Sequence, residues 1–305
     1  MTEDQNGFFR PKGKADAVLD TDAYNEIDDQ FAISYLLASS GRVSVKAFYA
    51  APFLNHKSEN PRDGMEKSYR EILRLLELAD RPELQPYTFR GSEYYMPDEK
   101  TPVPSDASAD LAARAMAYSA EDPLYVLSIG AITNVASAIV AAPEIIDRIV
   151  VVWLGGNATY WPDTREFNMS QDIAAARVVF GSGVRLVQLP CMGVVEMLRT
   201  TRPELEFWLR GKNRLCDYLI DNTVAEAESY AEGKPWSRVI WDIAAVAWLL
   251  DADGRMTDQI MIPAPLPGYD NRYQFNALEH RITCVRHIDR DAVFESLFSG
   301  LADMK

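Results

Sequence analysis

The sequence has little of what builds disulfide frameworks, thiolate metal sites or membrane spans. Its 305 residues include three cysteines, Cys191, Cys216 and Cys284, which lie far apart and form no CxxC pair. This usage indicates neither a zinc ribbon nor a disulfide framework. No stretch approaches the ~18 uninterrupted apolar residues of a membrane helix, and the N-terminus lacks the apolar segment of a signal peptide. We therefore expect a reduced, soluble, cytoplasmic protein without a membrane partner.

Positive charge is also scarce. The chain has 31 lysines and arginines against 45 aspartates and glutamates, which gives a formal net charge of −14. Nucleic acids bind to basic faces, so the balance argues against a nucleic-acid partner and disfavours a highly phosphorylated substrate. A neutral small molecule, or a site that holds a cation, fits this charge better.

Short β-branched runs alternate with helical segments along the first two thirds of the chain. We expect strands at Ala17–Asp20, Val43–Ala50, Leu124–Ile129, Arg148–Leu154 and Arg185–Leu189. We expect helices at Asp28–Ala38, Arg62–Leu78, Thr133–Ala142 and Asp172–Phe180. Such alternation, with nearly continuous apolar strands, predicts an α/β fold with an open, mostly parallel sheet flanked by helices on both faces.

The last third of the chain has a different pattern, with longer helical stretches and irregular segments. Helices are expected within Pro203–Ala231, Asp242–Leu250 and Asp289–Phe298, and a strand at Arg281–Val285. We find no repeat, low-complexity tract or linker, so residues 1–305 are expected to form a single domain. Three long loops, at Ala51–Pro61, Gly91–Ser105 and Gly155–Gln171, are candidates for function because compact domains rarely carry such loops without a role.

An acidic loop follows the first expected strand. Residues 20–29 read DTDAYNEIDD and bring five carboxylates to that strand's end: Asp20, Asp22, Glu26, Asp28 and Asp29. Ligands of open parallel sheets bind beyond the carboxyl ends of the strands. A helix N-terminus stabilises a nearby carboxylate by only ~0.3–1 kcal/mol, less than the repulsion within a buried cluster. A hard cation, Ca²⁺ or Mg²⁺, would relieve this repulsion; a solvated acidic turn with Asp28 or Asp29 as a helix cap is the alternative.

Further motifs follow in order. Tyr87–Gly91 reads YTFRG, Gly130–Val135 reads GAITNV, Gly155-Gly156-Asn157 precedes Glu166-Phe167-Asn168, and Trp241-Asp242 opens an apolar helix. Together with the acidic loop, these segments resemble the inosine–uridine-preferring nucleoside hydrolase family. Its corresponding motifs are written DTDxGxDD, GPLTN, GG…GN…EFN and HDPLA, and the resemblance covers roughly residues 16–250.

This resemblance implies hydrolysis of the N-glycosidic bond of ribonucleosides with the help of Ca²⁺, by a homodimer or homotetramer. It implies that the protein ligands of the metal are Asp22, Asp29, Asp242 and the backbone carbonyl of Thr133. Asp22 would also act as the general base that takes a proton from the attacking water. The residues implied in binding the ribose are Asp28, Asn55, Asn157, Glu166 and Asn168.

The sequence departs from the family pattern in two places. The spacing between Asp22 and Asp28 is two residues longer than usual, and Asn25 and Glu26 either bulge outward or add ligands to the site. Many members place a histidine before the aspartate of the last motif, where this chain has Trp241. A tryptophan there is similar to the purine-specific branch, in which stacking raises the basicity of the base.

We therefore expect purine nucleosides to be favoured, with Trp241 on one face of the base and Trp161 or a loop tyrosine on the other. The chain has three histidines, and His56, in the loop after the second strand, is the alternative acid. Two other functions stay open at this point. One is a nucleoside- or ribose-binding protein without turnover, and the other is a haloacid-dehalogenase-like phosphatase, which also begins with Asp-x-Asp after a strand.

Overall fold

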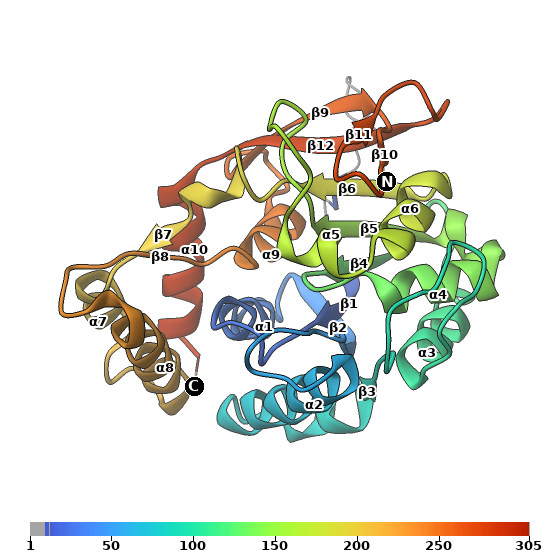
Figure 1. Ribbon diagram of the computed structural model, residues 1–305. Helices are drawn as coiled ribbons and strands as arrows, with labels where there is room; N and C mark the ends of the chain where they lie inside the picture. Colours follow the sequence, from blue (N-terminus) through green and yellow to red (C-terminus); the bar gives the residue numbers. More distant parts are fainter. Residues whose placement is uncertain (1–9, 12, 305) are drawn as a thin grey trace.

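One central sheet organises the computed structural model, which describes residues 10–11 and 13–304 (Figure 1). The sequence predicts no signal peptide at the N-terminus. That segment lies largely outside the described residues. In spatial order the strands are β3 (Thr88–Arg90), β2 (Val43–Ala50), β1 (Ala15–Thr21), β4 (Leu124–Ser128), β5 (Ile149–Leu154), β6 (Arg185–Leu189), β12 (Arg281–Ile288) and β9 (Thr257–Pro263). All neighbouring strands pair in parallel except β12 and β9, which are antiparallel.

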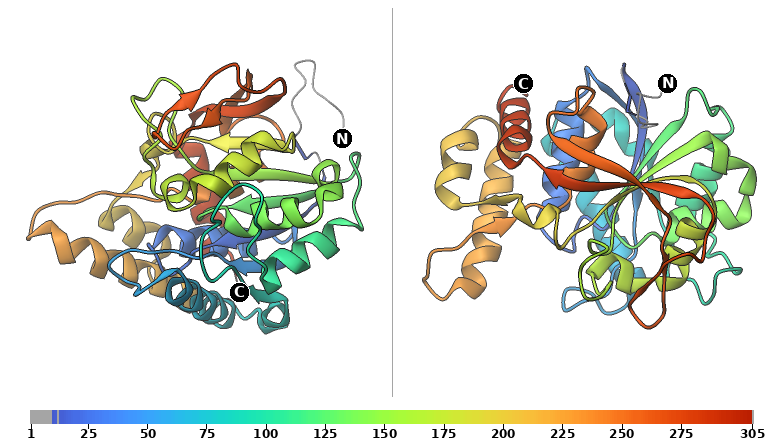
Figure 2. Two further views of the ribbon diagram at one scale, coloured as in Figure 1. Left: turned by 45° about the vertical axis from the view of Figure 1, so that its right-hand side comes forward. Right: turned by 90° about the horizontal axis from the view of Figure 1, so that it is seen from above.

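Helices cover both faces of this sheet, as the sequence predicts. One face carries α1 (Asp28–Ala38), α2 (Pro61–Leu78), α7 (Arg202–Leu209), α8 (Arg214–Ala231), α9 (Ile243–Leu250) and α10 (Arg290–Ala302). The other carries α3 (Asp106–Ala115), α4 (Thr133–Ala141) and α6 (Ile173–Gly181). Helices α7 and α8 form an outer layer beside α10 (Figure 2). None of the helices in the described ranges is both long and apolar enough to cross a membrane.

The central strands have buried side chains on both faces because their residues alternate between two hydrophobic cores. In β4, Leu127 packs into the core beneath α1 and α9, while Val126 packs into the core beneath α3 and α4. In β5, Val152 and Val151 divide in the same way. The centre of the sheet is therefore buried on both faces, and the loops at its carboxyl edge are anchored to this buried core.

Smaller elements connect these layers. Two short antiparallel pairs join β7 (Arg199–Thr200) to β8 (Arg238–Val239) and β10 (Leu266–Pro267) to β11 (Tyr273–Gln274). The short helix α5 (Phe167–Gln171) precedes α6, and 3₁₀ turns occupy Pro82–Tyr87, Pro143–Arg148 and Val195–Met197.

The predicted strands and helices are confirmed to within a few residues, with several differences. The stretch Pro203–Ala231 divides into α7 and α8, because the chain turns at Gly211, where φ is +71°. The strand predicted at Arg281–Val285 extends to Ile288. Helices α3 and α5 and the edge strand β9 were not predicted; β9 mixes polar and apolar residues and is only partly buried, which weakens its periodic signal.

Candidate active site

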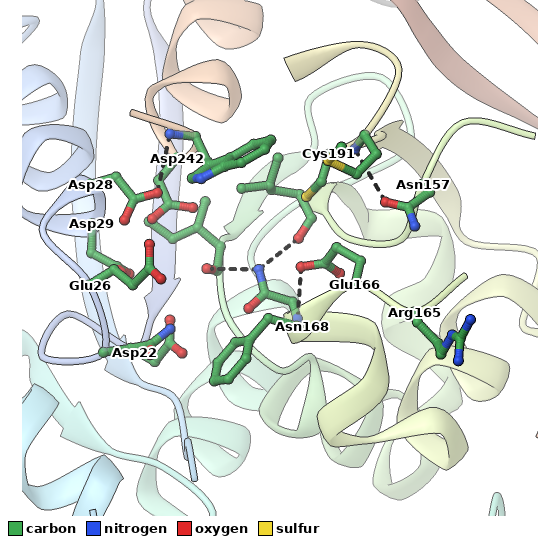
Figure 3. Close-up of a pocket in the computed structure, with 16 residues that line it drawn as sticks. Asp22, Glu26, Asp28, Asp29, Asn157, Arg165, Glu166, Asn168, Cys191 and Asp242 are labelled. Atoms are coloured by element: carbon green, nitrogen blue, oxygen red, sulfur yellow. Dashed lines mark hydrogen bonds between the residues drawn. The ribbon is translucent and has the colours of Figure 1, made fainter. Parts of the chain in front are cut away.

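A pocket opens at the carboxyl edge of the sheet (Figure 3). Four of its residues belong to neighbouring strand ends: Asp22 follows β1, Ile129 follows β4, Leu154 ends β5, and Cys191 comes two residues after β6. This is the position at which parallel sheets bind ligands. The pocket thus lies at the carboxyl end of the first strand, where the sequence placed the acidic loop.

Three carboxylates meet at one wall of this pocket. Asp28 and Asp29 begin α1, and Asp242 directly precedes α9; one carboxylate oxygen from each lies within 4.8 Å of the others. All three side chains are buried. Burial raises the pKa of Asp29 to about 7 and raises the pKa of Asp28 and Asp242, whose acidic neighbours raise it further. Hydrogen bonds fix the group, since Thr21 Oγ1 donates to Asp29 and the Trp241 N–H donates to Asp28 Oδ2 (3.1 Å).

Asp22 completes the acidic group. It is 1% exposed, and neither of its carboxylate oxygens has a hydrogen-bond partner among the described residues. Burial raises its pKa, and the charges of Asp29 and Asp28 add to this effect. A Cβ at Gly130 would lie 3.0 Å from Asp22 Oδ1, so this glycine gives the carboxylate room. A buried carboxylate with both oxygens unpartnered is costly unless a cation or a ligand binds it.

This donor set fits a divalent cation. Asp22, Asp28, Asp29 and Asp242 offer only oxygen ligands, which suit hard cations such as Ca²⁺ and Mg²⁺ rather than thiolate-seeking metals. The orphaned oxygens of Asp22 and the proximity of the other three carboxylates are the features that such an ion would resolve. The prediction of a cation-binding acidic loop therefore has a geometric basis.

The two extra residues of the loop take different positions. Asn25 lines the pocket, and its side-chain oxygen accepts a hydrogen bond from Asn55 Nδ2 (2.6 Å). Glu26 also lines the pocket and pairs with Arg238 Nη2 (2.7 Å), which in turn bonds Glu226 on α8 (2.8 Å). Neither residue simply bulges outward. The longer spacing adds one amide and one carboxylate to the pocket wall.

The segment between β5 and α6 forms the opposite wall. The Glu166 carboxylate caps α5, accepting from the N–H groups of Gly156, Asn168 and Met169 at 2.8–3.0 Å. Asn168 Nδ2 donates to the carbonyls of Ile129 (3.2 Å) and Leu154 (3.0 Å), which leaves its side-chain oxygen as the group available to a ligand (Figure 3).

Asn157 also lines the pocket, and its side chain ties two loops together. Its Nδ2 donates to the Asp163 carbonyl (3.1 Å), and its oxygen accepts from the Met192 N–H (3.2 Å). Glu166 and Asn157 are therefore largely occupied by backbone groups, whereas Asn168 presents a free acceptor.

Two predicted site residues do not line the pocket. Thr133, whose backbone carbonyl was the expected ligand, is not among the lining residues, and its hydroxyl donates to Asp172 Oδ2 (2.7 Å). Ile129, just before the Gly130–Val135 motif, lines the pocket instead. Asn55 contacts the site only through Asn25. Asp20 is also elsewhere: it is fully buried and accepts from Asn134 (2.7 Å) and Ser128 (3.0 Å), and burial raises its pKa to about 7.

Aromatic and sulfur-containing side chains form the rest of the wall. Trp241 and Phe167 line the pocket, together with Met192 and Cys191. Trp161 does not, so Phe167 is the second aromatic ring, and no histidine lies among the described lining residues. Burial raises the pKa of the Cys191 thiol, which bonds Glu166. Sequence reasoning missed Phe167, Met192 and Cys191; the only signal for Cys191 is its place just after a predicted strand.

Comparison with known proteins agrees with these observations. The sequence model described as inosine-uridine preferring nucleoside hydrolase matches residues 17–295. The chain is 25% identical to the pyrimidine-specific ribonucleoside hydrolase RihA of Klebsiella pneumoniae, over 90% of this chain and 95% of the relative.

Solved structures share the fold. A plant nucleoside hydrolase, PpNRh1, superposes with a TM-score of 0.75 at 19% identity, covering 95% of this chain and 99% of that one. A purine-preferring ribonucleoside hydrolase from Gardnerella vaginalis gives 0.74 at 19% identity, covering 95% and 98%. The predicted fold class, a mostly parallel sheet between helices, is thereby confirmed.

Proposed function

Because the chain belongs to the inosine-uridine preferring nucleoside hydrolase family, we propose that it hydrolyses purine ribonucleosides to ribose and free base with the help of Ca²⁺. One observation carries this proposal: the buried Asp22 carboxylate has two unpartnered oxygens beside Asp28, Asp29 and Asp242, in a pocket at the strand ends. Membership of this family argues against the alternative of a haloacid-dehalogenase-like phosphatase.

Asp22, Asp29 and Asp242 would hold the cation, with a peptide carbonyl as a further ligand. Thr133, the residue expected to supply that carbonyl, does not line the pocket, whereas Ile129, just before the Gly130–Val135 motif, does. The chemistry that such an ion supplies when bound is a lowered pKa of the attacking water and a contact to the ribose hydroxyls. Asp22 would accept the proton of that water, because its oxygens are committed to no other group.

The ribose would lie between the two polar walls. Asp28 on one wall and the side-chain oxygen of Asn168 on the other can accept hydrogen bonds from its hydroxyls. Glu166 and Asn157 support this arrangement by holding the segment that carries Asn168. Contacts that tighten as the sugar flattens stabilise the transition state more than the bound substrate. They therefore lower the activation free energy and raise kcat, rather than only lowering the KM.

The purine preference rests on the aromatic wall. Trp241 and Phe167 can stack on a base, and N7 of a stacked purine can take a proton from solvent. A pyrimidine offers no such nitrogen, and the described lining residues include no histidine to protonate it. Relatives differ in this respect, since the name of RihA states pyrimidine specificity and that of the Gardnerella vaginalis enzyme a purine preference. The cytoplasmic location and the homodimer or homotetramer stay predictions.

A direct assay tests the proposed function. Inosine, guanosine, uridine and cytidine are incubated with the protein in Ca²⁺ and after chelation, and reducing sugar is measured. We expect release from the two purine nucleosides, faster than from the pyrimidines, and loss of turnover on chelation. Binding without release of base would make this a nucleoside-binding protein, and faster cleavage of uridine would contradict the purine preference.

A further inference from the structure

The charge and the proton donors of the pocket bear on which base can leave it. Six carboxylates line the pocket: Asp22, Glu26, Asp28, Asp29, Glu166 and Asp242. Arg165 is the one cationic side chain among the described lining residues, and its guanidinium is paired with Asp163 (2.6 Å). Glu26 is likewise paired with Arg238 (2.7 Å), and the other five carboxylates outnumber the two charges of a bound divalent ion. Such a pocket attracts a cationic ligand.

The same wall is poor in groups that can protonate a base. No histidine, lysine or tyrosine lies among the described lining residues. The Cys191 thiol is engaged with Glu166, and Glu26 is engaged with Arg238. In the proposed function the remaining carboxyls of the acidic loop and Asp242 serve the cation and the ribose. A neutral base therefore departs without a proton from a lining side chain, and a stacked purine has to take that proton from solvent.

The aromatic wall of the pocket would also hold a positively charged base. Trp241 and Phe167 line the pocket, and the faces of aromatic rings attract cations, tryptophan most strongly. The negative lining, the aromatic wall and the lack of an acid thus favour one kind of leaving group.

Resting on the proposed function, we propose that this pocket prefers ribonucleosides whose base carries a fixed positive charge, such as N-ribosylpyridinium and N7-alkylated purine ribosides. When the bond between C1′ and the base nitrogen breaks, its electron pair neutralises the charged ring, and the base leaves neutral. Water forms the new bond to C1′, and its proton passes to Asp22. No acid is needed, which matches the residues present.

The first test compares substrates on the wild-type enzyme. Guanosine, 7-methylguanosine (at pH 6, where it is cationic) and N-ribosylnicotinamide are assayed by chromatography of the released base. We expect a higher kcat/KM for both cationic substrates than for guanosine. If guanosine is cleaved as well as they are, the substrate inference is overturned and the proposed function stands. If no nucleoside of either kind is cleaved, both fail.

The second test removes the intrinsic lability of 7-methylguanosine from the comparison. Trp241→His places an acid beside Asp242, whereas Trp241→Phe keeps a ring without an acid. Histidine can protonate N7 of guanosine but not the methylated N7, so the ratio of kcat/KM for 7-methylguanosine over guanosine should fall in Trp241→His. We expect a fall of about tenfold or more, at the low end of general acid catalysis. Trp241→Phe keeps a ring that attracts a cation less strongly, so the ratio should fall less in this variant than in Trp241→His.

A third variant tests the contribution of charge. Glu26→Gln removes one lining carboxylate, and Glu279→Gln, at an exposed residue outside the pocket, is the matched control. The ratio should fall in Glu26→Gln and not in Glu279→Gln. A ratio that is equal in wild type, Trp241→His and Glu26→Gln would show that neither the missing acid nor the pocket charge selects the base, and would overturn the inference.

Discussion

At the scale of single residues, Asp22 differs from the other carboxylates of the acidic loop in having no partner. Asp29 accepts from Thr21 and Asp28 from the Trp241 N–H, while Asp20 is fully occupied by Asn134 and Ser128. The resemblance implies Asp22 as the general base. The hydrogen-bond pattern supports this role over Asp20, because both oxygens of Asp22 are unpartnered among the described residues and Asp22 lines the pocket.

We expect Asp22→Asn to lower kcat by roughly 10²–10⁴, the usual range for a general base, with a smaller change in KM. The amide keeps the shape of the side chain but cannot accept the proton of water. Steady-state kinetics with inosine measure both constants. Asp20→Asn is the matched control: it should lower the melting temperature by disturbing buried hydrogen bonds but keep kcat within a few-fold. Near-wild-type turnover in Asp22→Asn would transfer the role of base to another group.

Asp29→Ala should weaken Ca²⁺ binding, because one of the clustered ligand oxygens is lost. A ligand that binds only the folded state stabilises it by about 2.7 kcal/mol at a hundredfold excess over its Kd. Calcium should therefore raise the melting temperature of the wild type by more than that of the variant, as measured by calorimetry. Equal calcium affinities in the two proteins would rule out Asp29 as a ligand.

At the scale of elements, the short helix α5 shows where local sequence signals were insufficient. The long loop Gly155–Gln171 was singled out as a candidate for function, and its Glu166 and Asn168 line the pocket. The helix within it has only five residues, Phe167–Gln171, too few for a periodic pattern. Its start depends on Glu166, whose carboxylate caps it by accepting from the N–H groups of Asn168 and Met169.

Glu166→Ala should loosen this helix by about 1 kcal/mol, the typical value of a lost N-terminal cap. Because Asn168 sits in the first turn, we expect the KM to rise more than kcat falls. Hydrogen–deuterium exchange of the segment 155–171 should become faster in Glu166→Ala and recover in part in Glu166→Gln, which keeps one acceptor oxygen. Unchanged exchange in the alanine variant would mean that the cap does not order this wall.

The parallel core was predictable because its strands are continuous apolar runs joined by long helices. Strand β9 was not, since a half-exposed edge strand has no unbroken apolar run, and the antiparallel pairing with β12 is set by tertiary packing. The site followed the same division. Asp29 and Asp242, predicted at helix starts, line the pocket together, whereas Thr133 and Asn55, which were expected only from the resemblance, do not line it.

At the scale of the whole molecule, the acidic cluster ties folding stability to pH. The pKa of Asp29 is raised from 3.8 to about 7 by burial, so the folded state binds this proton more tightly than the unfolded state. The resulting stabilisation is complete below about pH 4 and is lost as the pH rises through about 7. Without a bound cation, the contribution of Asp29 to the free energy of unfolding should therefore be smaller at neutral pH than near pH 4.

We expect the metal-free wild type to lose free energy of unfolding relative to Asp29→Asn as the pH rises from about 4 to about 7. The amide does not titrate, so the difference between the two proteins isolates this carboxyl. Urea unfolding in a chelating buffer at several pH values measures it. A difference that is independent of pH would show that Asp29 titrates alike in the folded and unfolded chains.

The hydrogen bond from Trp241 to Asp28 also bears on how this enzyme can change over generations. The backbone N–H of Trp241, and not its indole, holds Asp28, while the side chain faces the pocket. A mutation of this side chain therefore alters the surface that meets the base without removing the contact to the acidic cluster. A single substitution at this position can thus change the surface that meets the base while the backbone contact to Asp28 is inherited unchanged.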